Sequence, residues 1–264
     1  ANTTAGKVTV NKSVFDKLNM SASWRKGNLY AYIASTELNG VPFKLSLSVN
    51  NLKSIRRKIR TSIYWRDLDP VAFVGTVKDF VTVITPLLKK KPNFKAPVEG
   101  QLAWMRNFRD RLPKFMQNFA GNLTADTFST QILSGNRFSA EFDFTGMRAG
   151  MNNLSGPLEA RLEGGVIHQM EKLAEEQQAL NITFQPFILM HRMERAGSFK
   201  VGQVLKDVPF NDMALSVEFN KGNMQIKNAY TVGPTISAAV SGWTDWVNEN
   251  FDIIIWTMFN NTSR

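Results

Sequence analysis

The fold is decided by residues 208–259, which read VPFNDMALSVEFNKGNMQIKNAYTVGPTISAAVSGWTDWVNENFDIIIWTMF. Apolar and polar residues alternate in this stretch, as where Leu215, Val217 and Phe219 alternate with serine, glutamate and asparagine. Glycines such as Gly222 separate the alternating runs. A period of two places one set of side chains on each face of a sheet. The stretch therefore predicts antiparallel strands in series, with an apolar face that a helix, a second sheet or a lipid must cover.

The same alternation occurs nearer the N-terminus. Residues 7–10 predict a short first strand, and residues 24–34 and 41–49 predict two strands joined through Leu38-Asn39-Gly40. Asn-Gly between alternating runs is a strong hairpin signal. Residues 61–65 continue the sheet. Further strands are predicted at residues 121–130, 138–145 and 158–167.

Between these strands the period changes to that of a helix. Asp69-Pro70 is typical of a helix start, with aspartate as the N-cap and proline in the first turn. Residues 101–120 carry an apolar stripe at spacings of three and four: Met105, Phe108, Leu112, Phe115, Met116 and Phe119. This stripe packs on the sheet or lies on a membrane surface. A third helix is predicted at residues 169–180.

These elements together predict an α+β fold. It consists of a long, curved, largely antiparallel sheet that is not closed, with two to four helices packed against it. Residues 1–90 form the N-terminal strands and a helix, and residues 91–100 form a linker rich in proline and glycine. Residues 101–264 form a β-rich region that continues the same sheet.

Several motifs in the C-terminal part resemble those of a known family. They are a Pro209-Phe210 strand start, Gly222 followed by Ile226, Gly233-Pro234 followed by Gly242, and Asp245 followed by Asp252-Ile253. This pattern resembles the C-terminal region of bacterial AsmA-like envelope proteins, the group that includes the TamB, YhdP and YdbH types. Residues 121–126, 139–144 and 154–167 resemble earlier strands of the same kind.

The resemblance implies a function and a location. AsmA-like proteins are expected to hold acyl chains on the apolar face of an incompletely closed sheet, between the two bacterial membranes. The expected location is the periplasm, with an anchor in the inner membrane that precedes this chain, since the first residue is Ala1 rather than methionine. The expected partners are phospholipid or another acyl lipid, the bacterial membrane surface and other envelope proteins.

Candidate lipid-binding residues follow from the alternation. They are the large apolar side chains that share one face of the predicted strands: Phe43, Leu45, Leu47, Phe138, Phe142, Phe144, Val217, Phe219 and Ile226. An acyl chain needs a long dry surface rather than specific polar contacts, because each buried methylene contributes about 0.8 kcal/mol.

The chain carries a net charge of +10, which favours polyanionic partners. Basic residues that could pair with lipid phosphates at the rim of the apolar face are Arg56, Arg57, Lys58, Arg60, Arg106 and Arg109. Residues 53–60 fit a strand or a short basic helix equally well. No nucleic-acid-binding motif accompanies the charge, so nucleic acid is not an expected partner.

Catalysis has little support in the sequence. There is no cysteine, and the only histidines are His168 and His191. No nucleophile elbow, phosphate-binding glycine loop or zinc-protease motif is present. Asp67 and Asp69 could bind a cation, but the N-cap role explains Asp69 without one. We therefore expect no cofactor, no metal and no enzymatic activity. Three hypotheses stay open: a lipid-handling envelope protein, a scaffold or assembly factor whose sheet is closed by its own helices, and, least favoured, an enzyme.

Overall fold

The structure, a computed structural model, describes residues 2–51, 58–70, 72–73, 76, 118–146, 152–168, 207–248 and 250–260. Most residues in these ranges are in β-strands, and all of the strands belong to one sheet. The first strands are β1 (Asn2–Val10), β2 (Ser13–Arg25), β3 (Asn28–Leu38), β4 (Val41–Asn50), β5 (Lys58–Trp65) and the short β6 (Asp67–Leu68). They are followed by β7 (Asn118–Ser129), β8 (Leu133–Thr145), β9 (Ser155–His168), β10 (Asp207–Asn220), β11 (Asn223–Val232), β12 (Ile236–Asp245) and β13 (Asn250–Phe259).

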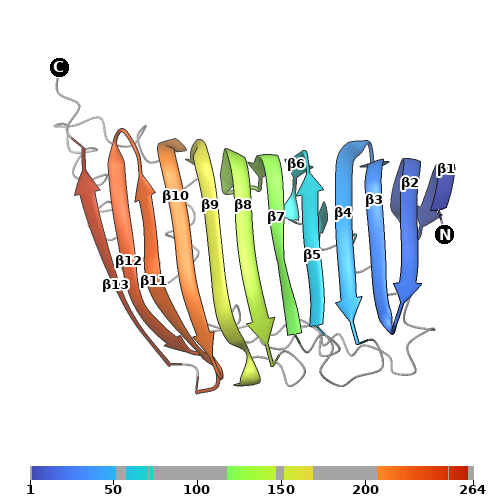
Figure 1. Ribbon diagram of the computed structural model, residues 1–264. Helices are drawn as coiled ribbons and strands as arrows, with labels where there is room; N and C mark the ends of the chain where they lie inside the picture. The colour runs from blue at the N-terminus through green and yellow to red at the C-terminus, as the bar shows by residue number, and fades with distance from the viewer. Residues whose placement is uncertain are drawn as a thin grey trace.

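The strands stand side by side in sequence order, so that β1 and β13 lie at opposite ends of the sheet (Figure 1). Nearly all neighbours pair antiparallel. A two-residue turn, such as the one between β10 and β11, requires this direction. The exception is β7, which pairs parallel with both β5 and β6. A parallel pair needs a crossover connection, and the chain between β6 and β7 provides it.

The predicted α+β class is wrong. The described ranges are almost entirely strand, and α-helical backbone is limited to Pro70, residues 72–73 and Thr76. A helical turn does begin at Pro70, where the Phe73 amide donates to the Asp69 carbonyl at 2.9 Å. The Phe73 ring packs on Trp65 with centroids 5.6 Å apart, and Thr76 is buried. The other residues of that predicted helix lie outside the described residues. The predicted linker and the helix at residues 169–180 also lie outside them.

Where the predicted helix at residues 101–120 can be compared with the structure, it gives way to a strand. Residues 118–120 belong to β7, and Phe119 is the cross-strand partner of Phe144. Pairing with two neighbouring strands therefore outweighs the local helical period at Phe119. The rest of this segment lies outside the described residues.

Tight turns set the register of the first hairpins. The Asn39-Gly40 turn has φ angles of 52° and 82°, which is the left-handed pair that a two-residue hairpin requires, and the predicted hairpin is confirmed. A second turn of the same kind at Lys26-Gly27 was missed. It ends β2 and starts β3 at Asn28, so the predicted strand over residues 24–34 is really the junction of two strands.

The motif residues near the C-terminus have structural roles. Gly222 occupies a left-handed turn with φ 92°, and Gly242 has φ 135°. A Cβ atom on Gly242 would lie 2.0 Å from the Asp252 carbonyl oxygen of β13, so only glycine fits there. The Asp245 carboxylate accepts hydrogen bonds from the Val247 and Asn248 amides and so closes the turn between β12 and β13.

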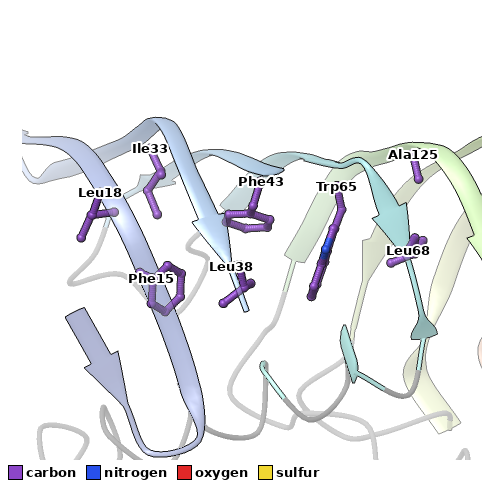
Figure 2. Close-up of a cluster of buried hydrophobic side chains, with 8 residues drawn as sticks. All are labelled: Phe15, Leu18, Ile33, Leu38, Phe43, Trp65, Leu68 and Ala125. Carbon is purple, nitrogen blue, oxygen red and sulfur yellow. The ribbon is translucent and has the colours of Figure 1, made fainter. Parts of the chain in front are cut away.

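Two clusters of buried hydrophobic side chains lie on one face of the sheet. The first consists of Phe15, Leu18, Ile33, Leu38, Phe43, Trp65, Leu68 and Ala125, and Figure 2 shows these side chains on the same side of the strands. The second consists of Leu154, Val217, Phe219 and Trp246. We refer to the side of the sheet that carries both clusters as the apolar face, and to the opposite side as the polar face.

Candidate functional site

The register of the strands aligns a row of apolar side chains across the sheet. Directly paired residues of neighbouring strands lie on the same face. Following these pairs from β2 to β13 gives one uninterrupted row on the apolar face, which we call the central row: Met20, Ile33, Leu45, Ile63, Leu123, Ala140, Ala160, Leu215, Ala229, Val240 and Ile255. It contains no polar side chain.

Parallel rows flank the central row. On one side, Leu47 is linked by the same pairing to Thr61, Gly121, Phe142, Leu158, Val217 and Ile226. On the other side lie Phe138, Leu162 and Met213. The structure thus places all nine candidate lipid-binding residues on the apolar face, because Phe43, Leu45 and Leu47 alternate on β4, Phe138, Phe142 and Phe144 on β8, and Val217 and Phe219 on β10.

The candidate residues differ in how much of their surface is covered. Phe43, Val217 and Phe219 belong to the buried clusters and are at most 7% exposed. In the central row, Ile33 belongs to the first cluster, the residues from Leu45 onwards are half-buried, and Leu215 reaches 37% exposure. The central row is therefore only partly covered over most of its length, as are Phe138 and Phe142 in the rows beside it.

Small side chains occupy the middle of the central row. Ala140 and Ala160 are cross-strand partners on β8 and β9. They stand between the pair Phe142–Leu158 on one side and the pair Phe138–Leu162 on the other. The face is consequently lower along the two alanines than along the rows that border them.

Aromatic rings connect the second cluster to β7. Phe119 stacks on Phe142 with ring centroids 4.9 Å apart, and Phe142 stacks on Phe144 at 5.5 Å. Phe144 then meets the edge of Phe219 at 5.6 Å. Such ring pairs add about 0.5–1.5 kcal/mol each beyond the area they bury. These contacts connect β7, β8 and β10 along one side of the central row.

The predicted basic rim is only partly within the described residues. Arg56, Arg57, Arg106 and Arg109 lie outside them. Lys58 and Arg60 belong to β5, where they alternate with the apolar-face residues Ile59 and Thr61. Both therefore lie on the polar face, where Lys58 forms an ion pair with Asp143 at 2.9 Å.

The polar face carries cross-strand hydrogen bonds. The Arg161 guanidinium donates to both carboxylate oxygens of Asp212, at 2.8 and 3.2 Å, and the Tyr230 hydroxyl donates to the same carboxylate at 2.9 Å. The hydrogen bond from Arg161 holds the pKa of the Asp212 carboxyl below its ordinary value, with a further contribution from Tyr230, while partial burial acts against them. The same carboxylate raises the pKa of Tyr230.

This cluster predicts a pH dependence of stability. A carboxyl whose pKa is lowered on folding stabilises the protein above its unfolded-state pKa of about 4, and this contribution is lost as the pH falls through the lower folded-state value. Asp212→Asn is therefore expected to lower the urea midpoint at pH 6, with a difference from wild type that shrinks below pH 4. Glu218→Gln, on the polar face of the same strand, is the control. An equal effect of Asp212→Asn at pH 6 and pH 3 would contradict the assignment.

A Ser-His-Asp chain, which sequence reasoning missed, links the ends of three strands. The Nδ1 atom of His168 lies 2.7 Å from the Asp207 carboxylate, and the Nε2 atom lies 2.8 Å from the Ser134 hydroxyl. Because an ionised carboxylate only accepts, Nδ1 donates its proton to Asp207, and Nε2 and the Ser134 hydroxyl share the second hydrogen bond. The sequence offered no signal, since the spacing of the three residues follows no motif.

This order of groups is that of a catalytic triad, but the surroundings differ. Ser134 is the second residue of β8 and is paired with Ser129 on one side and Val166 on the other. Its backbone groups are thus used by the sheet, whereas a catalytic serine sits on an exposed turn whose free amides bind the oxyanion. We interpret the chain as a cross-strand link between β8, β9 and β10.

The aspartates considered as cation ligands have protein partners. Asp67 accepts a hydrogen bond from the Thr127 hydroxyl at 2.7 Å, which joins β6 to β7. The Asp69 carbonyl accepts from the helical turn that follows it. Within the described ranges, no group of three or more histidines and carboxylates is placed to hold a metal ion.

The candidate site that the described residues present is thus an apolar surface. In the part of the chain that the structure describes, no helix has the length and apolar character needed to cross a membrane. Comparison of this chain with protein-family models, with curated proteins and with solved structures finds no match.

Proposed function

We propose that this protein binds an acyl lipid along the central row of its apolar face. The observation that carries the proposal is the unbroken apolar row from β2 to β13, half-buried over most of its length and lowest at Ala140 and Ala160. A hydrocarbon chain lying across the strands would contact this row and the aromatic border beside it.

The energetics of such binding are favourable without any specific polar contact. Strands are about 4.8 Å apart, so a row that crosses most of the sheet is long enough for a complete acyl chain. Burial of sixteen methylenes contributes up to about 13 kcal/mol, from which the cost of immobilising the chain is subtracted. Selectivity would then depend on chain length and headgroup.

The proposed setting is the bacterial periplasm. The AsmA-like resemblance in residues 209–253 supports this setting and a role in lipid transfer or outer-membrane biogenesis. The membrane surface and other envelope proteins are the proposed partners. The net charge of +10 suits contact with anionic headgroups.

Photocrosslinking tests the proposal directly. p-Benzoylphenylalanine at Leu45 or Phe142, on the apolar face, is expected to label phospholipid in protein isolated from a bacterial host. The same group at Ser139 or Glu218, on the polar face of β8 and β10, is the matched control. Equal labelling from the two faces would overturn the proposal.

One observation favours a second function, that of a scaffold with a closed core. The two clusters, the first of which includes Ile33 of the central row, are already buried, as in an ordinary protein interior. Native mass spectrometry separates the two functions. Lipid that co-purifies in a defined ratio supports the binding function, whereas a bare chain that stays bare after incubation with phospholipid vesicles supports the scaffold.

A further inference from the structure

Among the described strands, β13 is the last in the sheet. It pairs with β12 on one side, and within the described residues no strand pairs with its other side (Figure 1). The pairing with β12 runs without a shift from Asn250 to Phe259. The strand therefore has no bulge, and it contains no proline or lysine that would discourage another strand from adding to it.

Unlike the other strands, β13 is apolar on both faces. Its apolar-face residues include Phe251, Ile253 and Ile255. On the polar face it carries Ile254, Trp256 and Met258, which are 52%, 54% and 61% exposed, and Trp243 of β12 beside them is 43% exposed. A strand that is apolar on both faces is typical of a sheet interior, where both faces are covered.

The open backbone groups of β13 can be identified. The Asn260 amide donates to the Thr235 carbonyl at 2.8 Å, which makes this pair a hydrogen-bonded one. In an antiparallel pair the hydrogen-bonded residues alternate. Residues 250, 252, 254, 256 and 258 therefore bond to β12, and the amides and carbonyls of residues 251, 253, 255, 257 and 259 point away from the sheet.

We propose that two copies of this chain pair through β13, antiparallel and about a twofold axis, to give one sheet of double width. Centred on Ile255, this register brings Ile253 opposite Thr257 and Phe251 opposite Phe259, so every open backbone group of the strand finds a partner. On the polar face, Ile254 of one copy meets Trp256 of the other. The single charge, Asp252, lies opposite Met258 rather than opposite its own copy.

The other occupants fit this edge less well. A lipid surface would cover the exposed apolar side chains but leave the backbone donors without acceptors. The strand at the other end of the described sheet, β1, consists of small and polar residues with Lys7 near its middle, and pairing with it would leave Trp256 opposite polar groups. A second β13 satisfies both the backbone and the side chains, and its twofold contact closes as a dimer.

The oligomeric state tests the proposal. Light scattering after gel filtration is expected to give a mass of two 29.8-kDa chains. Thr257→Pro removes an outward amide without touching the bonds to β12, and Trp256→Lys places a charge in the contact. Each is expected to weaken the dimer at least tenfold while the circular dichroism spectrum is unchanged. Trp24→Lys, at a tryptophan that is 59% exposed on β2, is the control and should stay dimeric.

A wild-type chain that is monomeric at all concentrations overturns the proposal. So does a dimer that survives both substitutions, since its contact must then lie elsewhere. A monomer that binds phospholipid vesicles through Trp256 would assign this edge to a lipid surface instead.

Because the chain has no cysteine, single cysteines report the register. Ile255→Cys is expected to form an intermolecular disulfide readily, since partners in a hydrogen-bonded pair have Cα atoms about 5.5 Å apart. Ile253→Cys, on the same face of the same strand, faces Thr257 and is expected to crosslink poorly. Equal yields at the two positions would overturn the register.

Discussion

Replacing Phe219 with aspartate is expected to unfold the protein or to lower its free energy of unfolding by about 5 kcal/mol. Phe219 is 3% exposed and lies in the second cluster, where its ring meets Phe144. Loss of a buried aromatic side chain costs about 3–5 kcal/mol, and an unpaired buried carboxylate adds to it. Urea denaturation followed by circular dichroism measures the effect.

The control for this substitution is Ser139→Asp. Ser139 lies on the polar face and is the cross-strand partner of Arg161, so the new carboxylate meets water and a basic neighbour. Its expected effect is within about 0.5 kcal/mol. If Phe219→Asp changed stability no more than Ser139→Asp does, the apolar face at β10 would have to be hydrated.

Replacing Ala160 with phenylalanine is expected to abolish lipid binding while the protein stays folded. Ala160 is half-buried in the central row, next to Ala140 and the partly exposed Leu215. A phenyl ring there would fill the low part of the row that the proposed acyl chain occupies. Native mass spectrometry is expected to show at least a tenfold lower fraction of lipid-bound protein.

Ala214→Phe provides the matched control. Ala214 pairs with Arg161 and Tyr230 on the polar face, so the same change in volume occurs away from the row. Lipid binding by this variant should equal that of wild type. Binding that survives Ala160→Phe would place the lipid elsewhere on the molecule.

Alternation predicted the strands well where one face is apolar and turns are marked by glycine. The C-terminal strands from β10 to β13 and the Asn39-Gly40 hairpin follow from this local pattern. The shared face of Phe142, Phe219 and Ile226 also follows from it, because the period of two leaves no other arrangement once the strands pair in order.

The helical predictions show where a local pattern in the sequence fails to predict the secondary structure. The apolar spacing that ends at Phe119 is typical of a helix, yet Phe119 lies on β7 with partners on both sides. The missed turn at Lys26-Gly27-Asn28 is a different case, because it repeats the Lys221-Gly222-Asn223 sequence of the turn between β10 and β11. Both turns have the same left-handed backbone angles, so the signal was present in the sequence and was overlooked.

The sequence by itself determined that this protein has a wide sheet with one apolar face, because side-chain alternation is a local property of each strand. Only the tertiary structure decided which side chains share a row, the parallel pairing of β5 with β7, and the meeting of Ser134, His168 and Asp207. These depend on register between segments far apart in the chain. No local pattern encodes that register, because it is set by the simultaneous packing of all the strands.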